Sequence, residues 1–315
     1  MLYETLTDWL WGVPGDWRLR HCTCGLAWLD PQPSPPDIPK LYAGYYTHSG
    51  VEDRRLEGIR REVTKCVLAR MGYPVQPSPS RLARLLSHVP SMARARALEV
   101  FDLPASQIGT LLDVGCGNGQ FISQMRSLGW VACGVDPDPA AVAYGLSRGL
   151  KVFRGTISDV PVCPGYDVIT LNHVIEHVPD PTTLLRECKK RLTPRTGRIM
   201  ITTPNLNSLG HRWFGRYWRG LEPPRHLLIF STPALRRCVS QAGLYVNSLD
   251  TETRLARMIY NLSAYAKTGE TQIGNRTNFR PATKAAAFLF QAIQELSTLF
   301  RKDAGEELFC VCNAR

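Results

Sequence analysis

The segment that most constrains the fold covers residues 111–122 and reads LLDVGCGNGQFI. Its first residues are typical of a buried strand, and its last residues are typical of the start of a helix. Gly115, Gly117 and Gly119 lie at the bend, where the missing side chains let a ligand approach the backbone. An acidic residue, Asp113, stands before the first glycine. The pattern predicts a strand–turn–helix unit with a ligand site at the turn.

Beyond this unit, short apolar runs alternate with amphipathic stretches. Strands are expected at residues 110–114, 130–135, 151–153, 167–171, 198–203, 244–249 and 307–312. Helices are expected at residues 118–128, 139–148, 182–192 and 231–242. This alternation predicts an α/β fold with a parallel, doubly wound sheet of seven strands, which binds ligands at the carboxyl ends of its strands.

Residues 1–35 are expected to form a leader and a proline-rich linker ahead of the sheet. His21, Cys22 and Cys24 resemble half of a zinc knuckle, in which a tight turn brings a thiolate to the metal. Tetrahedral zinc needs four ligands, and no second cysteine pair precedes this one. We therefore favour a relic that binds no metal over a filled zinc site.

Residues 36–105 are expected to form a basic helical cap, because apolar residues recur at helical spacing among many arginines. We interpret these arginines as a solvated surface, with a ligand clamp as the alternative. The domain of residues 106–315 carries an insertion at about 257–303. Its apolar positions recur at helical spacing: Ala285, Leu289, Ala292, Ile293, Leu296 and Leu299. We expect this helix to pack on the body of the protein rather than on a membrane surface or a second copy.

The 315 residues carry a formal net charge of +11. Such a charge suits an acidic partner such as nucleic acid, anionic headgroups or an anionic substrate, or it reflects a solvated arginine-rich surface. Ten cysteines are scattered without a dense framework, which favours a reducing compartment. We find no signal peptide pattern and no apolar run long enough to span a membrane, so a cytoplasmic location is expected. The oligomeric state is left open.

The acidic residues indicate the ligand of the glycine turn. A dinucleotide fingerprint has the spacing G-x-G-x-x-G, whereas here G-x-G-x-G is followed by Gln120. Asp113 is badly placed for a pyrophosphate but well placed for an ammonium group. Asp136, at the end of the second strand, can accept hydrogen bonds from both ribose hydroxyls. These features predict S-adenosylmethionine, a nucleoside with a cationic amino-acid tail, and argue against a nicotinamide dehydrogenase.

Residues 113–119 and 134–136 resemble the first two motifs of class I S-adenosylmethionine-dependent methyltransferases. Residues 167–181, DVITLNHVIEHVPDP, are similar to the fourth-strand segment of the small-molecule subgroup related to ubiquinone-biosynthesis O-methyltransferases. The resemblance implies a Rossmann-like fold with an N-terminal leader like the zinc knuckle of some members. The cofactor-binding residues that it implies are Asp113, Gly115, Gly117, Gly119, Asp136, Pro137, Thr156, Ile157, Asn172 and His173.

Methyl transfer from a sulfonium requires an aligned acceptor and, for a hydroxyl acceptor, removal of its proton. His226 is the first candidate for this base, followed by Glu176 and His177. A histidine that only locks its loop is the alternative for His226, and a helix cap is the alternative for His177. A loop leaving the sheet edge is expected to contact the substrate through Trp213, Tyr217, Trp218, Glu222 and Arg225.

The residues after the fourth strand, Asn172-His173-Val174-Ile175, lack the Asn/Asp-Pro-Pro-aromatic signature of enzymes that methylate exocyclic amines of DNA. We therefore expect O-methylation of a small aromatic or anionic molecule, with C-methylation second and DNA excluded as a partner. An RNA methyltransferase and a catalytically silent scaffold that binds S-adenosylmethionine are the alternatives.

Overall fold

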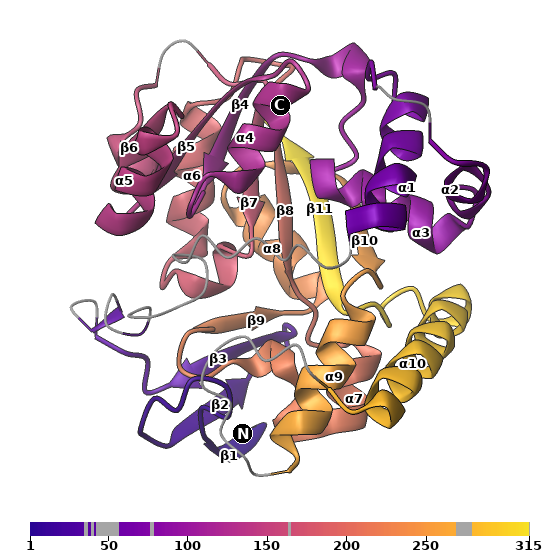
Figure 1. Cartoon of the computed structure of the whole chain (residues 1–315). Coiled ribbons are helices and arrows are strands. Elements are labelled where there is room, and N and C mark those ends of the chain that lie inside the picture. The colour runs from indigo at the N-terminus through magenta and orange to yellow at the C-terminus, as the bar shows by residue number, and fades with distance from the viewer. Residues whose placement is uncertain are drawn as a thin grey trace.

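The computed structural model describes residues 1–34, 37–38, 41, 57–75, 79–162, 165–268 and 279–314. Its larger sheet has the strand order β10-β11-β8-β7-β4-β5-β6 (Figure 1). The bounds are Thr110–Val114 (β4), Val131–Asp136 (β5), Val152–Arg154 (β6), Val168–Asn172 (β7), Arg198–Pro204 (β8), Tyr245–Glu252 (β10) and Glu307–Asn313 (β11). β11 runs antiparallel to both of its neighbours, and β4 to β8 are parallel. The expected doubly wound sheet of seven strands is confirmed, but it is mixed rather than wholly parallel.

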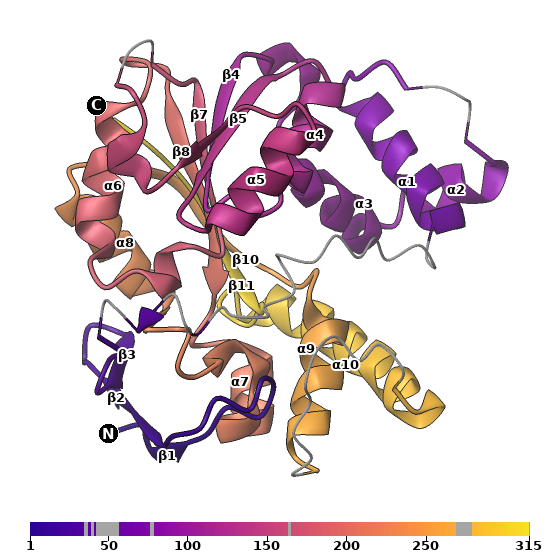
Figure 2. The same ribbon diagram turned by 60° about the vertical axis from the view of Figure 1, so that its left-hand side comes forward.

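Helices cover both faces of this sheet (Figures 1 and 2). They are α4 (Gln120–Ser127) and α5 (Pro139–Ser147) on one face and α6 (Pro181–Lys190) and α8 (Thr232–Gln241) on the other. Successive strand residues point to opposite faces, so Leu112 joins the apolar cluster under α6 and α8 while Leu111 joins the cluster under α4 and α5. Burial on both faces explains why the strands read as continuous apolar runs.

The expected helical cap consists of α1 (Glu57–Arg70), α2 (Arg81–Leu86) and α3 (Pro90–Ala97). Leu68 of α1 joins the apolar cluster under α4, which attaches the cap to the sheet. Most of the segment that precedes α1, together with residues 76–78, lies outside the described residues. Short 3-10 helices connect the larger elements at Leu98–Val100, Ala105–Gln107, Ile157–Asp159, Ile175–His177 (η7), Gly215–Tyr217 and Arg219–Leu221.

The expected N-terminal leader is instead part of a second sheet. Its strands β1 (Tyr3–Leu6), β2 (Trp17–His21), β3 (Leu26–Asp30) and β9 (Leu228–Phe230) pair antiparallel in that order. β3 pairs with β9, about 200 residues further along the chain, because both bury apolar side chains against one cluster that contains Ala27 and Ile229. We call this sheet, with α7 (Leu209–Phe214), α9 (Ala256–Ala266) and α10 (Pro281–Phe300), the second lobe.

The expected zinc ligands lie at the turn between β2 and β3. Cys22 Sγ accepts a hydrogen bond from the backbone N–H of Cys24 at 3.3 Å. Within the described residues, no group of three potential metal ligands includes either cysteine. The hypothesis that this segment is a zinc-knuckle relic without a metal therefore stays a prediction.

The insertion at 257–303 forms α9 and α10, and residues 269–278 lie outside the described part. α10 packs through Ala287, Phe290 and Gln294, which are buried. The helix packs on the body as expected, but not through the predicted stripe, because Leu289 and Leu296 of that stripe are exposed. Among the described helices, none is both long and apolar enough to cross a bilayer.

Candidate active site

The glycine turn between β4 and α4 has the conformation that its sequence predicts. Gly115, Gly117 and Gly119 have φ angles of 70°, 52° and 75°, which side-chain-bearing residues rarely adopt. A Cβ atom on Gly115 would lie 2.6 Å from Val174 Cγ2, and one on Gly119 would lie 2.5 Å from Leu150 Cδ1. The turn therefore requires glycine for its backbone conformation and for its packing.

Two carboxylates lie at the ends of the adjacent strands β4 and β5. Asp113 is buried and accepts a hydrogen bond from Thr170 Oγ1 at 2.7 Å. Burial, with the nearby charge of Asp136, raises the pKa of Asp113 to about 7. Asp136 accepts hydrogen bonds from the backbone N–H groups of Gly117 at 2.8 Å and Asp138 at 2.9 Å. Two carboxylates beside an open glycine turn suit a ligand with a cationic group and vicinal hydroxyls, so these residues fit S-adenosylmethionine.

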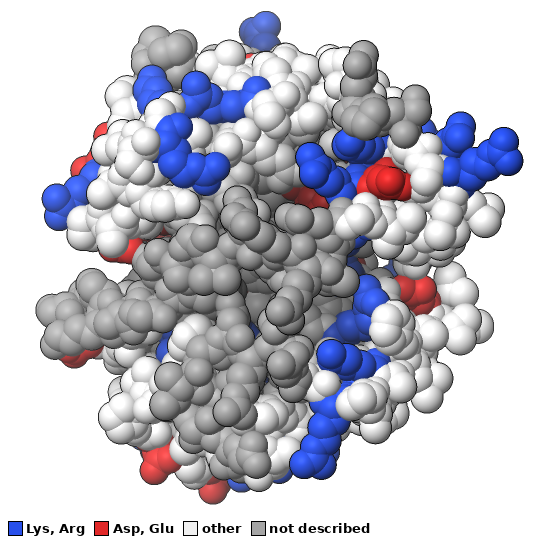
Figure 3. Space-filling view, viewed as in Figure 1, with Lys and Arg blue, Asp and Glu red and all other residues white. Residues whose placement is uncertain are grey.

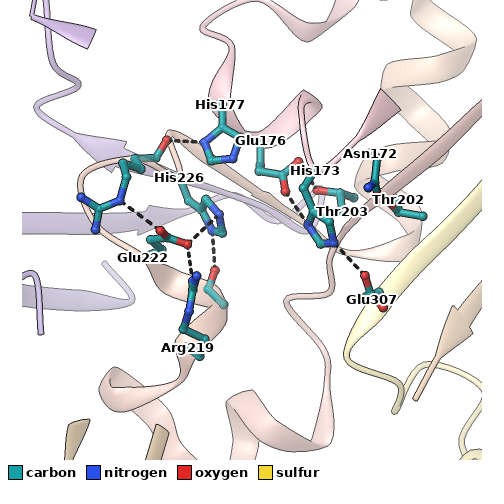
Figure 4. A network of polar contacts seen from close by, with 12 residues as sticks. Asn172, His173, Glu176, His177, Thr202, Thr203, Arg219, Glu222, His226 and Glu307 are labelled. Carbon is teal, nitrogen blue, oxygen red and sulfur yellow. Dashed lines mark hydrogen bonds and ion pairs between the residues drawn. The ribbon is translucent and has the colours of Figure 1, made fainter. Parts of the chain in front are cut away.

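A chain of charged residues begins at His173, directly after β7 (Figure 4). His173 Nδ1 lies 3.0 Å from Glu176 Oε1, and His173 Nε2 lies 2.8 Å from Glu307 Oε1. Glu176 also accepts a hydrogen bond from Thr203 Oγ1, and Glu307 accepts two from Arg254. Burial alone would lower the pKa of His173, but its hydrogen bonds to the two glutamates raise it to about 9.

These contacts bear on two of the sequence-based interpretations. His173 uses both ring nitrogens to bind glutamates, so its side chain is an imidazolium that links β7 to β11, and its expected contact with the cofactor stays a prediction. Burial alone would raise the pKa of Glu176, but the hydrogen bond with His173 lowers it to about 2. A fully buried carboxylate with so low a pKa is a weak proton acceptor, so Glu176 does not suit the expected role of base.

His177 and His226 face each other across the junction with the second lobe, with ring centroids 4.8 Å apart (Figure 4). His177 Nδ1 lies 3.0 Å from the carbonyl oxygen of Arg225, and His226 Nδ1 lies 2.7 Å from that of Gly220. A carbonyl only accepts, so each Nδ1 carries a proton, and His226 Nε2 lies 3.5 Å from Glu222 Oε2. Burial lowers the pKa of His226 to about 4 and keeps it neutral at pH 7.

These two histidines and Glu176 also form a possible metal-binding group. In the described part of the chain, they are the residues whose potential ligand atoms all lie within 4.8 Å of one another. One carboxylate and two imidazoles are a donor set that divalent metals use. Both Glu176 oxygens are already bonded to His173 and Thr203, so a metal there would compete with this network.

A family model described as a methyltransferase domain matches residues 80–249. This chain belongs to the methyltransferase domain family. With the acidic pair at the glycine turn, the match confirms the expected class I S-adenosylmethionine-dependent methyltransferase.

Its relatives include proteins named ubiquinone biosynthesis O-methyltransferase. The one from Proteus mirabilis is 29% identical over 170 residues, which cover 46% of this chain and 68% of that protein. The one from Vibrio campbellii is 36% identical over 105 residues, which cover 31% of this chain and 44% of that protein. The match to the second relative therefore spans less than half of its length.

Solved structures with similarity include a Haloferax volcanii methyltransferase in complex with the Trm112 methyltransferase activator. It is 18% identical, with a TM-score of 0.48, over 88% of this chain and 97% of that chain. A SAM dependent methyltransferase from Archaeoglobus fulgidus is 18% identical, with a TM-score of 0.42, over 65% of this chain and 86% of that chain.

The remaining expected cofactor residues of this methyltransferase lie at the carboxyl ends of β5, β6 and β7. Pro137 is exposed after β5, and Thr156 caps a short helix after β6 with its side chain near Asp159. Ile157 is buried in the core, whereas Asn172 is exposed and accepts a hydrogen bond from Thr202 at 2.6 Å. The structure brings these positions to one sheet edge, and their contacts with the cofactor stay predictions.

Glu222 and Arg225, expected to contact substrate, are instead buried in an ion-pair network. Arg225 binds Glu222 at 3.0 Å and Asp8 at 2.8 Å, and Glu222 also binds Arg219. Burial alone would raise the pKa of Glu222, but Arg219 and the neighbouring cations lower it. The methyltransferase thus uses these charges to join the loop that carries His226 to the N-terminal segment.

The aromatic residues expected to line the substrate site build the second lobe. Trp218 is buried and donates from Nε1 to Glu306 Oε2 at 2.8 Å. Tyr217 packs on Trp9, and Trp213 packs edge-on against Phe290. Trp213 is 52% exposed and is therefore the most solvent-accessible of these three residues.

Sequence reasoning missed the partners that complete these networks. Thr170, Thr203 and Glu307 lie on strands that were expected, but strand periodicity does not reveal which polar residue meets which. Asp8 carried a local signal, since its carboxylate accepts backbone N–H groups two and three residues later, as in an Asx turn.

Proposed function

We propose that this methyltransferase transfers a methyl group from S-adenosylmethionine to a hydroxyl oxygen of a small molecule. The observation that carries the proposal is the pair His177 and His226, whose tautomers are fixed by backbone carbonyls beside the carboxyl edge of the sheet. The names of the relatives, O-methyltransferases of ubiquinone biosynthesis, support oxygen as the acceptor and favour a small molecule over RNA.

In this proposal Asp113 accepts the ammonium group of the cofactor and Asp136 accepts the ribose hydroxyls. S-adenosylmethionine supplies a methyl group on a sulfonium, which is already an activated electrophile. The protein therefore has to orient the acceptor and hold its proton.

His177 suits proton removal better than His226, the first candidate from the sequence. The pKa of about 4 makes His226 a weak base, and its ring is buried, whereas His177 is partly exposed and can be reached by an acceptor molecule. A neutral His226 also lets His177 take up a proton without a second cation against its ring.

Cofactor binding tests the first half of the proposal. Asp136→Asn removes the charge that faces Gly117, and we expect it to weaken S-adenosylhomocysteine binding by about 100-fold, since a hydrogen bond to a charged group contributes roughly 1.5–3 kcal/mol. Asp138→Asn is the matched control, because asparagine also caps α5 well. Calorimetric titration with equal affinities for both variants would contradict the assignment.

Turnover tests the second half. The protein is incubated with deuteromethyl-labelled cofactor and a panel of phenols, catechols and sugars, and NMR of the product identifies the methylated atom. We expect an O-methyl product and a loss of about 100-fold or more in His177→Asn, the usual range for a general base. His88→Asn, an exposed histidine of the cap, is the control. Tight S-adenosylhomocysteine binding without any product would instead favour the silent scaffold.

A further inference from the structure

The outer face of α10 is an apolar surface that nothing in the described part of the chain covers. Phe288, Leu289, Leu296, Leu299 and Phe300 are between 60% and 88% exposed. Together with Ala285 and Ala292 they follow the i, i+3, i+4, i+7 spacing of one helix face, opposite the buried residues of α10. A helix that is apolar on both faces is normally buried on both, so the exposed face indicates a partner.

Basic residues flank α10 and its neighbour α9 in the sequence. The described residues from 256 to 303 contain six Lys or Arg, all exposed: Arg257, Lys267, Arg280, Lys284, Arg301 and Lys302. The same residues contain two acids, Glu295 and Asp303, both partly buried and bonded to neighbours. Arg257 lies over the ring of Phe288 at 4.5 Å, so one cation is directly at the apolar face.

The figures place this surface at the outside of the molecule. α10 lies at the edge of the second lobe, packed against α9, in both ribbon views (Figures 1 and 2). In Figure 3 the surface over α10 is largely uncharged, with Lys and Arg side chains on its inner side and a small acidic patch at its upper end.

We propose that the outer face of α10 is a docking surface for a phospholipid bilayer that carries anionic headgroups. Aromatic and leucine side chains enter the boundary between headgroups and acyl chains, while the surrounding cations bind the headgroups, as in interfacial amphipathic helices. The helix lies on the membrane and does not span it, in line with the absence of a spanning helix among the described elements.

Charge favours the bilayer over a second copy of the chain. A twofold symmetric contact would press this face against itself and bring the cations at both ends of α10 against their copies. The whole chain carries a net charge of +11, so self-association is opposed at long range as well. An anionic membrane surface would attract the same Lys and Arg side chains.

The test is flotation of the full-length protein with vesicles of phosphatidylcholine alone or mixed with phosphatidylglycerol. We expect binding to the anionic vesicles that weakens at high salt. Leu296→Gln with Leu299→Gln should lower binding at least about tenfold, because each leucine loses its favourable transfer from water. Lys284→Gln with Lys302→Gln should lower binding to anionic vesicles by about tenfold.

Tyr144→Gln with Leu146→Gln, two exposed residues of α5, is the matched control and should leave binding unchanged. Unaltered S-adenosylhomocysteine affinity in every variant shows that the fold is intact. Vesicle binding needs no methyl acceptor, so its outcome is independent of the proposed O-methylation.

Three results would overturn the proposal. One is no binding to either vesicle type, and another is equal binding by the α10 double variant and the wild type. The third is a dimer in analytical ultracentrifugation that the leucine substitutions abolish, which would assign the face to a second copy.

Discussion

Replacing Asp8 with asparagine should loosen the junction between the N-terminal strands and the loop of residues 219–226. Asp8 Oδ2 lies 2.8 Å from Arg225 Nη2, and the two side chains are 1% and 0% exposed. Asparagine keeps an oxygen for the N–H groups of Leu10 and Trp11, but it removes the charge and the oxygen that accepts from Val13 N–H and Arg225. Breaking a buried pair by removing one charge costs about 3–5 kcal/mol, and because Arg225 keeps Glu222 we expect about 3 kcal/mol.

The measurement is the free energy of unfolding in guanidinium chloride, with the melting temperature as a second readout. A loss of about 3 kcal/mol corresponds to a fall of roughly 5 °C in a chain of this size. Asp16→Asn, an exposed aspartate on the same segment, is the control and should change stability by less than about 0.5 kcal/mol. The affinity for S-adenosylhomocysteine should hold in both variants, because Asp113 and Asp136 lie at other strand ends.

A double-mutant cycle separates the ion pair from other effects of the substitution. Arg225→Met alone leaves the Asp8 carboxylate buried without its cation, whereas the combination with Asp8→Asn removes both charges. We expect the double variant to lose less free energy of unfolding than the two single variants lose together, by at least about 1.5 kcal/mol. Additive losses, or a change below about 0.5 kcal/mol in Asp8→Asn, would refute the assignment of Asp8 and Arg225 as the anchor of this loop.

Three further predictions concern single groups at the sheet edge. The pKa of His173 is raised to about 9. The stability that protonated His173 gives the fold is therefore fully present below its ordinary pKa near 6.5, and it is lost as the pH rises through 9. The free energy of unfolding should therefore fall between pH 6.5 and 10 by about 2 kcal/mol more in the wild type than in His173→Asn. Gly119→Ala should destabilise the protein more than Gly149→Ala. Both substitutions strain a residue with positive φ, but only the first places a Cβ 2.5 Å from Leu150 Cδ1. Melting curves of the two variants measure the difference. Because the pKa of Asp113 is raised to about 7, S-adenosylhomocysteine affinity should fall by up to about tenfold per pH unit below 7 in the wild type and stay flat in Asp113→Asn, as measured by titration across that range.

The parts of the fold that the sequence predicted are those with a local signal. The strand at 110–114 and the turn at Gly115 to Gly119 could be predicted because apolar periodicity and glycine spacing act over a few residues. The pairing of β3 with β9 could not be predicted, because no local pattern reports contact between residues 200 apart. The same holds for His173, whose second glutamate comes from β11.

The helix at α10 shows a different limit of sequence reasoning. Its apolar stripe was identified, but the residues on the opposite face, Ala287 and Phe290, are also apolar. Periodicity therefore located a helix without indicating which face packs, and only the arrangement of α9 and α10 decides that Phe290 is buried and Leu299 exposed. Helices that are apolar on both faces are positions where a partner of the folded protein can be inferred.

The contacts between the sheet core and the second lobe explain how the site is fixed in place. Apolar side chains fill both faces of the sheet, and such packing is not directional. The second lobe joins the sheet partly through the same apolar core, because Leu227, Leu228 and Phe230 belong to the cluster under α6 and α8. It also joins the sheet through directional contacts, since Arg254 binds Glu307 and His177 donates to the carbonyl of Arg225. Hydrogen-bonded charges require particular distances and angles, so a shift of the lobe would leave charges unpaired at a cost of several kcal/mol. The position of His226 against His177 therefore depends on these directional contacts as well as on the shared apolar core.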